Sequence, residues 1–485
     1  MEVQALLAST DNIKPDHLVG DMTLSPNDIK LTLNVLQQIA DDPTLIDDHD
    51  RFKSLIAKIY KQGKKGKKQQ LCSQKKAETQ ALVQNTTIVQ SQLQHRPIAK
   101  ESVPFSQHKY QVLPHAQSCY ICKRSYMNLH FFYHALCPSC AEFNYQKRFQ
   151  KTDLTGRIAL VTGGRIKVGY QTALRLLRDG AKVIITTRFP GDAAQRFSHE
   201  SDFDQWQNRL VIYGLDLRNI PAVDSFIENL IQTESALDIL INNAAQTIKR
   251  PLAFYRHLLV QEEQLQKSLP ASISSLSLQN TTVPVLLEAQ PNYPSLVQDL
   301  SRSNLDFPPN QFDSNGEQLD RRAINSWKLK LGEISMIEML EVQLANVVAP
   351  FLLNSKLKPL LMRSSFSRRF MINVSAKEGL FNSQYKTVFH PHTNMAKAAL
   401  NMMTRTSADD YVQDKIYMNS VDPGFISDQN PDHQQIGTQQ KREFYLPLDA
   451  IDSMARLYDP IVQGIQNFDE PVWGQFLKDY VPSAW

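Results

Sequence analysis

One stretch of the sequence, Asp153 to Phe197, constrains the fold more than any other. It begins with a short apolar run at residues 158–161, which is typical of a buried strand, and three glycines follow closely. Apolar side chains at helical spacing then span residues 170–178, and a second apolar, β-branched run covers residues 182–187. Strand, glycine turn, helix and strand make one βαβ unit, so this stretch predicts an α/β fold.

The glycine turn of this unit predicts a nucleotide site. Free N–H groups at a helix N-terminus can hold a pyrophosphate, because the helix dipole favours negative charge there. A strand before the turn and a helix after it turn a weak motif into a strong dinucleotide signal. The residues of the turn that we expect to bind the cofactor are Thr162, Gly163, Gly164, Arg165, Lys167, Val168 and Gly169.

Arg188 follows the second strand of the unit directly. A cofactor without a 2′-phosphate would favour an acid at this place, where it holds the ribose hydroxyls. An arginine matches a phosphate instead, and Arg165 and Lys167 could join it from the turn. We therefore predict NADP(H) rather than NAD(H). The alternative is that Arg188 is a solvated surface charge.

These residues resemble the short-chain dehydrogenase/reductase family, which opens with T-G-x-x-x-G-x-G. Thr162, Gly163 and Gly169 match this motif, whereas Lys167 replaces the middle glycine. Lys167 must therefore adopt an unusual backbone conformation or displace the phosphates and meet them with its ammonium group. The resemblance covers about residues 154–485 and implies a doubly wound parallel sheet of the Rossmann type.

The resemblance also implies cofactor residues further along the chain. An Asp-Leu pair after the third strand contacts adenine in the family, the motif N-N-A-G lines the cleft, and a P-G motif lies beside the nicotinamide. The family lysine of the catalytic helix binds the nicotinamide ribose. The matching positions in this chain are Asp216, Leu217, Asn243, Ala244, Lys397, Pro423, Gly424 and Ser427.

The catalytic pattern of the family is incomplete in this sequence. Asn346 matches the asparagine that helps to hold a proton-relay water, and Lys397 matches the family lysine. Thr393 stands where the family has its tyrosine, and Ala376 stands where it has its catalytic serine, with Ser375 matching the other serine. A tyrosine has a reference pKa of about 10, and a threonine alcohol is a far weaker acid. The cofactor half of the site is thus expected to survive without the usual proton donor.

A replacement donor is expected in the loop before the catalytic helix or at the start of that helix. His392 borders Thr393 and can titrate near neutral pH, so we include it with the catalytic residues. The other candidates are Glu378, Tyr385 and His390. We favour an NADP(H)-dependent oxidoreductase of a small carbonyl or alcohol. The alternatives are a noncatalytic NADP(H) sensor or scaffold and, ranked last, a nucleic-acid adapter.

Two C-x-x-C pairs precede the nucleotide domain. Cys119 and Cys122 are separated by fourteen residues from Cys137 and Cys140, which is a strong zinc signature. Four thiolates complete a tetrahedron around Zn²⁺ and leave no open position, so we expect a zinc ion that supports folding. The module, at residues 106–150, resembles a small zinc ribbon or treble clef. Its function would be docking on the next domain or binding a partner, and we favour docking.

The remaining parts of the chain carry weaker signals. We expect a helical segment at residues 1–62 and a basic, polar linker at residues 63–105. Residues 51–76 hold ten Lys or Arg and no acid, which could attract nucleic acid or anionic lipid, but a solvated hinge is favoured. The N-terminal segment is expected to bind a protein or, less readily, nucleic acid.

An insertion at about residues 247–325 interrupts the domain at 151–485. It is expected to be a lid or substrate-shaping arm, or else a surface excursion for oligomer contacts. The family resemblance implies a dimer or tetramer. No apolar run is long enough to cross a membrane, and the acid at position 2 argues against a signal peptide, so we expect a cytoplasmic protein.

Overall fold

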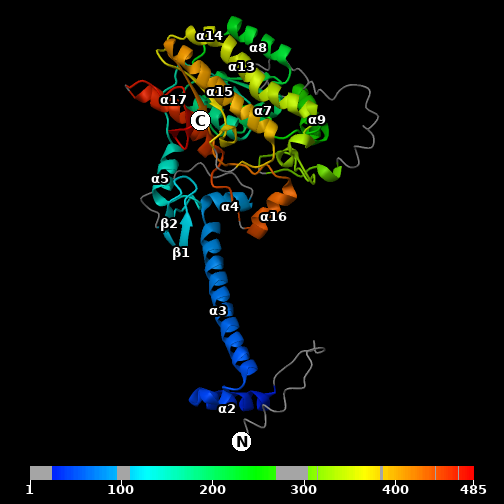
Figure 1. The fold of residues 1–485 in the computed structure, drawn as a ribbon. Helices are drawn as coiled ribbons and strands as arrows, with labels where there is room; N and C mark the ends of the chain where they lie inside the picture. The colour runs from blue at the N-terminus through cyan, green and yellow to red at the C-terminus, as the bar shows by residue number, and fades with distance from the viewer. Residues whose placement is uncertain are drawn as a thin grey trace. The chain divides into compact units, whose positions relative to one another are not determined.

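The computed structural model describes residues 25–94, 110–268, 304–313, 315–382, 386–442, 444–467 and 469–485 (Figure 1). The chain divides into two units, residues 1–78 and 79–485, which are described separately. In the first unit α2 (Pro26–Asp41) begins after Ser25, whose hydroxyl oxygen accepts the N–H of Asp28 at 3.2 Å, as the sequence predicts. The 3₁₀ turn η1 (Pro43–Ile46) follows.

The segment expected as a linker is helical as far as it is described. It lies in α3 (Asp50–Gln84) and α4 (Thr87–Gln94). Lysine, glutamine and alanine are good helix formers, and each of the two glycines, Gly63 and Gly66, costs only about 1 kcal/mol. The basic side chains of α3 are mostly exposed. Helix propensity therefore outweighs the glycines in this segment.

The second unit is built on an eight-stranded sheet with the order β10-β9-β8-β7-β6-β3-β4-β5. All neighbouring strands are parallel except β9 and β10. The chain order reverses between β3 and β6, and ligands bind outside the carboxyl ends of the strands at such a point. The strands are β3 (Ile158–Thr162), β4 (Lys182–Thr187), β5 (Leu210–Gly214), β6 (Ile239–Asn242), β7 (Arg369–Val374), β8 (Ile416–Val421), β9 (Phe476–Lys478) and β10 (Val481–Ser483).

Helices cover both faces of this sheet, which is the doubly wound arrangement that the sequence predicts. One face buries apolar side chains of α6 (Lys167–Arg178), α7 (Pro190–Ser198) and α17 (Ala450–Gln466). The other face buries those of α8 (Ile220–Thr233), α13 (Ala349–Lys356), α14 (Lys358–Met362) and α15 (Pro391–Gln413). The other elements are α9 (Leu252–Ser268), α12 (Met336–Gln343), α16 (Asp432–Arg442), the π-helical turn η7 (Leu344–Val348), and the 3₁₀ turns η3 (Phe203–Gln205), η4 (Gln207–Arg209), η5 (Ser326–Lys328), η6 (Leu331–Glu333) and η8 (Lys377–Gly379).

The helical stretch Met336–Lys356 is long and apolar enough to cross a membrane by length and composition. It is the only such stretch within the described ranges. It contributes Ala349 and Leu353 to the core against the sheet and carries the buried acids Glu338 and Glu341. Packing against the sheet therefore explains part of its apolar character, whereas Met336, Leu340 and Phe351 remain at least half exposed.

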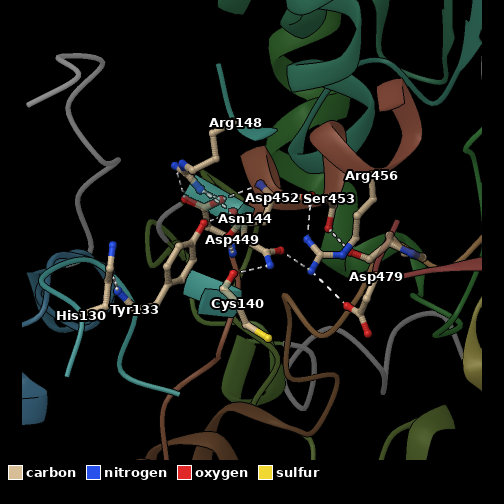
Figure 2. A network of polar contacts seen from close by, with 11 residues as sticks. His130, Tyr133, Cys140, Asn144, Arg148, Asp449, Asp452, Ser453, Arg456 and Asp479 are labelled. Carbon is tan, nitrogen blue, oxygen red and sulfur yellow. Dashed lines mark hydrogen bonds and ion pairs between the residues drawn. The ribbon is translucent and has the colours of Figure 1, made fainter. Parts of the chain in front are cut away.

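The cysteine module consists of a hairpin, β1 (Gln111–Ser118) with β2 (Ser125–Leu129), followed by α5 (Pro138–Lys147). It docks on the start of α17, as the sequence analysis favoured. The guanidinium of Arg148 binds Asp449 at 2.7 Å and Asp452 at 2.9 Å, and the hydroxyl of Tyr133 donates to Asp452 at 2.5 Å (Figure 2). Because these groups are largely buried, the module is an integral part of the second unit.

Candidate cofactor and active site

The ends of β3 and β6 are joined at the point where the strand order reverses. The hydroxyl oxygen of Thr162 accepts the N–H groups of Asn243 and Ala244, each at 3.0 Å. In return, the amide of Asn243 donates to the carbonyl oxygens of Thr162 and Gly163 at 3.0 and 3.2 Å. Three residues predicted from the sequence thus fix the geometry of the glycine turn.

The turn leaves no room for larger side chains at its last glycine. A Cβ atom on Gly169 would lie 2.2 Å from the carbonyl oxygen of Gly163. Lys167, in the place of the family's middle glycine, has φ +52°, which is left-handed backbone. The unusual conformation expected for Lys167 is therefore present. The N-terminus of α6 has no side-chain cap at Ile166, and its first residues, Lys167, Val168 and Gly169, line the cavity described next.

A cavity of about 1690 Å³ opens beside this turn. Its walls also include the end of β4, residues 215–218 after β5, residues 243–248 after β6, the flanks of the insertion and residues 426–430. Of the predicted cofactor residues, the following line it: Gly163, Arg165, Lys167, Val168, Gly169, Arg188, Asp216, Leu217, Asn243, Ala244 and Ser427. Thr162, Gly164, Pro423, Gly424 and Lys397 lie outside the cavity wall.

Arg188 differs from the other arginines of the cavity wall. Its Nη2 donates to the hydroxyl of Tyr255 at 2.8 Å, and its guanidinium lies 4.5 Å from the centre of the Tyr255 ring and 5.5 Å from that of Phe189. Five other arginines line the cavity, and each is paired with one or two carboxylates: Arg165, Arg178, Arg218, Arg250 and Arg321. Within the described residues, Arg188 is the cavity arginine without a carboxylate partner.

Two predicted cofactor residues are engaged inside the protein. The guanidinium of Arg165 bridges Asp192 at 2.7 Å and Glu317, in the insertion, at 2.5 Å. Its charge is thus balanced, although the sequence suggested that it could join a 2′-phosphate. The carboxylate of Asp216 is bound by Arg218 at 2.6 Å. Both residues line the cavity, but their charges are already compensated.

A chain of polar contacts runs from Asp216, which is predicted to contact adenine, to Asn346. Arg218 contacts Glu341 of α12 at 3.1 Å, and the other carboxylate oxygen of Glu341 accepts from the side chain of Gln246 at 3.0 Å. The backbone of Gln246 in turn exchanges two hydrogen bonds with the amide of Asn346, at 2.7 and 2.9 Å. Asn346 lies in the π-helical turn η7, a type of irregularity that often occurs at functional sites.

The catalytic residues predicted from the family pattern are brought together, and they are deeply buried. Lys397 is 6% exposed, and its Nζ donates to the carbonyl oxygen of Val374 at 2.7 Å. Burial lowers the pKa of Lys397 to about 8. The hydroxyl of Ser375 donates to Asn401 at 2.6 Å. The hydroxyl of Thr393 is buried without a hydrogen-bond partner among the described residues.

The histidines near Thr393 have protein partners. Nε2 of His392 lies 3.3 Å from Oε1 of Glu338, but the two atoms do not form a well-aligned hydrogen bond. Burial raises the pKa of Glu338, but the proximity of His392 and Ser326 outweighs it and holds that pKa below its usual value. His390 stacks on Trp327 at 3.8 Å between ring centres, and burial lowers its pKa. Glu378 is half-buried, and Tyr385 lies outside the described residues.

Three residues that shape this site are not among those that the sequence predicts. Asp422, directly before Pro423, is buried; burial raises its pKa, and it accepts the N–H of Gly424 at 2.8 Å. Tyr120, between the first two cysteines, accepts the N–H of Phe425 at 3.2 Å. Tyr255 holds Arg188. Asp422 could have been noticed beside the P-G motif, whereas the two tyrosines carry no local signal.

The four predicted zinc ligands converge. The sulfur atoms of Cys119, Cys122, Cys137 and Cys140 all lie within 4.8 Å of one another, with Cys122 and Cys137 at 3.6 Å. A tetrahedron with Zn–S bonds of about 2.3 Å has sulfur–sulfur edges of nearly 4 Å. One pair comes from the turn of the hairpin and the other from the start of α5. The donor set therefore fits a zinc ion.

Comparisons with known proteins agree with this geometry. The family model for short chain dehydrogenase matches residues 157–275. The chain is 33% identical over 360 residues to the uncharacterized protein R665 of Acanthamoeba polyphaga mimivirus, covering 71% of each chain. It is 29% identical over 165 residues to bovine retinol dehydrogenase 12, covering 30% of this chain and 51% of that protein.

Among solved structures, a short chain dehydrogenase from Burkholderia cenocepacia in complex with NADP is 18% identical, with a TM-score of 0.43. That alignment covers 67% of this chain and 97% of the other. Residues 157–275 thus match the short chain dehydrogenase family, and the strand order and the glycine turn described above agree with that match.

Proposed function

We propose that this protein is an NADP(H)-dependent oxidoreductase acting on a small carbonyl or alcohol substrate. The observation that carries the proposal is the guanidinium of Arg188, which faces the cavity after β4 and has no carboxylate partner among the described residues. A guanidinium that packs against two aromatic rings and lacks a carboxylate partner matches a phosphate. The 2′-phosphate of NADP(H) would supply the missing negative charge.

The residues present fit a dinucleotide. The N-terminus of α6 and Lys167 would hold the pyrophosphate, and Arg188 the 2′-phosphate. Lys397, which matches the family lysine of the nicotinamide ribose, lies outside the cavity wall and donates to the carbonyl oxygen of Val374. The cofactor supplies or accepts the hydride. Asn346 is held by the backbone of Gln246 and thereby oriented. Thr393 is too weak an acid to donate the proton, and His392, paired with Glu338, is the candidate that we propose in its place.

A binding experiment tests the choice of cofactor. NADPH and NADH are titrated against the full chain by calorimetry, and NADPH is expected to bind more tightly. Arg188→Ala should weaken NADPH binding about 10- to 100-fold and leave NADH binding unchanged, because a hydrogen bond between charged groups contributes about 1.5–3 kcal/mol. Arg256→Ala, which removes an exposed cation from α9, is the control. Tighter binding of NADH by the wild type would contradict the proposal.

Turnover distinguishes an enzyme from a sensor. A panel of small carbonyl and alcohol substrates is screened with both cofactors, and activity should be lost in Lys397→Ala. His392→Asn should reduce kcat and alter its pH profile while cofactor binding is retained. Cofactor binding without turnover on any substrate would favour the sensor that the sequence left open.

The cysteine cluster is proposed to hold a structural zinc ion. Four thiolates fill the coordination shell, so the ion would stabilise the hairpin and α5 and take no part in the reaction. Metal analysis of the purified chain should find about one zinc per chain. Cys140→Ser should lower both the zinc content and the melting temperature.

Self-association is proposed on the evidence of exposed apolar side chains. Met336, Leu340 and Phe351 on α12 and α13, and Met395 and Met402 on α15, are each at least half exposed. A surface of this kind marks an interaction site. Sedimentation of the wild type is expected to show a dimer or tetramer, and Phe351→Glu should shift it toward monomer.

A further inference from the structure

We propose that Tyr255, in the insertion, forms the second half of the 2′-phosphate site and donates its phenolic proton to a phosphate monoester. The inference rests on the proposed function and extends it to a residue outside the βαβ unit. Tyr255 lies in α9, 67 residues after Arg188, and lines the same cavity. The insertion would therefore take part in cofactor recognition.

The hydrogen bond between these two residues has a defined direction. Arg188 has only donors, so the oxygen of Tyr255 accepts its N–H at 2.8 Å. The phenolic proton of Tyr255 is thus left to donate elsewhere, and no acceptor for it is found within the described residues. A phosphate bound by the guanidinium would lie beside this proton. A dianionic phosphate monoester can accept from both groups at once.

The charge balance around Tyr255 favours an anion. Arg250, which also lines the cavity, is paired with Asp320, and Arg218 is paired with Asp216 and Glu341. A carboxylate at position 255 would neutralise Arg188 in the same way. A phenol orients the guanidinium without neutralising it, so the positive charge remains available to a ligand.

The position of Tyr255 is fixed by packing. Its side chain is 8% exposed and lies in a cluster with Phe189, Phe254, Leu258 and Phe307. One turn further along α9 than Leu258, the carboxylate of Glu262 accepts the N–H groups of Gly191 and Asp192 at 2.9 and 2.8 Å. These N–H groups lie in the first turn of α7, which starts just after Arg188. The helix is therefore held against the segment that carries the arginine.

The test compares ligands with and without a 2′-phosphate. Tyr255→Phe keeps the aromatic ring over Arg188 and removes only the hydroxyl group. In the full chain it should weaken binding of NADPH and of adenosine 2′,5′-bisphosphate by about 3- to 10-fold, which corresponds to one hydrogen bond. Binding of NADH and of 5′-AMP should stay within error of the wild type. Loss of affinity for all four ligands alike would indicate a structural effect and overturn the inference.

A matched control separates recognition from stability. Tyr411→Phe removes a buried hydroxyl that donates to the carbonyl oxygen of Asn354 at 2.9 Å, away from the cavity wall. It should lower stability without changing the preference for the 2′-phosphate. If the wild type prefers NADPH but Tyr255→Phe retains that preference in full, the inference fails and the proposed function stands. If the wild type shows no preference for NADPH, the proposed function fails as well.

Discussion

The two ends of the proposed nucleotide cleft, an adenosine end at Arg188 and a nicotinamide end at Lys397, differ in what they leave free for a ligand. At the adenosine end, the guanidinium of Arg188 faces an open cavity and lacks a carboxylate partner among the described residues. At the nicotinamide end, Lys397 is bound to a backbone carbonyl, and neither Lys397 nor Thr393 reaches the cavity wall. The end proposed to bind the 2′-phosphate keeps the family's features, whereas the end proposed to react lacks the tyrosine that the family pattern has at Thr393.

The two ends are also supported by different additions to the family fold. The insertion braces the adenosine end through Tyr255 and Glu317, which bind Arg188 and Arg165. The cysteine module braces the nicotinamide end, because Tyr120 binds the backbone of Phe425 directly after the P-G motif. Each addition therefore touches one end, which suggests that recognition and chemistry can be perturbed separately.

Arg148→Ala should have the largest effect on the free energy of unfolding, because it removes the ion pairs that hold the cysteine module beside the nicotinamide end. Arg148 is buried against Asp449 and Asp452, and removal of one partner leaves buried charges uncompensated. We expect a loss of about 3–5 kcal/mol in the free energy of unfolding, measured by chemical denaturation. Arg124→Ala removes an exposed cation from the same module and should change stability little. The preference for NADPH over NADH should survive in both variants, and its loss in Arg148→Ala would show that the two ends are linked.

Lys397→Met should show the cost of burying the catalytic cation. Burial lowers the pKa of Lys397 from 10.5 to about 8, so the unfolded chain binds the proton more tightly than the folded one. The wild type should therefore gain stability as the pH rises from about 8 to 10.5, by roughly 2–3 kcal/mol relative to Lys397→Met. Below pH 8 the wild type bears the full free-energy cost of burying the charged amine of Lys397. The methionine variant is therefore expected to be the more stable of the two at that pH.

Denaturation of both proteins at pH 7.5, 9 and 10 measures this difference. Lys151→Met, at an exposed position, should run parallel to the wild type at every pH. A constant difference between the wild type and Lys397→Met over this range would contradict the burial of a charged amine at the nicotinamide end.

The adenosine end was more predictable from sequence than the nicotinamide end. Gly163 and Gly169 form a local turn, and the βαβ sequence pattern predicts that turn from residues close together in the chain. The docking of the cysteine module was also anticipated, because a short connection follows Cys140. The contact of Tyr255 with Arg188 could not be anticipated, since it joins residues 67 positions apart, one at the end of β4 and the other in the insertion. The helix in place of the expected linker was not predicted for another reason. A basic, polar segment can have the same composition in a helix as in a flexible hinge, so composition does not distinguish the two.

Thr393→Val tests whether the threonine at the nicotinamide end takes part in chemistry. Its hydroxyl is buried without a partner among the described residues, so its removal should stabilise the fold by about 1 kcal/mol and leave turnover unchanged. Thr404→Val, on the same helix, is the matched control. The hydroxyl of Thr404 bonds Leu400, Asn373 and Ser420, so the same substitution should cost about 1–3 kcal/mol. A loss of turnover in Thr393→Val alone would identify Thr393 as a working part of the site.

Lys167→Gly should have the smallest effect on stability. It also tests whether Lys167 and Arg188 bind different phosphates at the adenosine end. Lys167 has φ +52°, and a lysine in this left-handed region is strained relative to glycine. Glycine relieves that strain but gains more freedom in the unfolded chain, so the net gain should be only about 0.5–1 kcal/mol. Lys415→Gly, at φ +56° after α15, should stabilise the fold by a similar amount without affecting nucleotide binding.

Nucleotide binding then separates the two cations of the cavity wall. The pyrophosphate is common to NADPH and NADH, so loss of the Lys167 ammonium should weaken both by the same factor of a few-fold. Loss of the Arg188 guanidinium should weaken only NADPH. The ratio of the NADH dissociation constant to the NADPH dissociation constant is therefore expected to be the same in Lys167→Gly as in the wild type. In Arg188→Ala this ratio should fall. If Lys167→Gly changed this ratio instead, the lysine would contact the 2′-phosphate. The assignment of the pyrophosphate to Lys167 and of the 2′-phosphate to Arg188 would then be wrong.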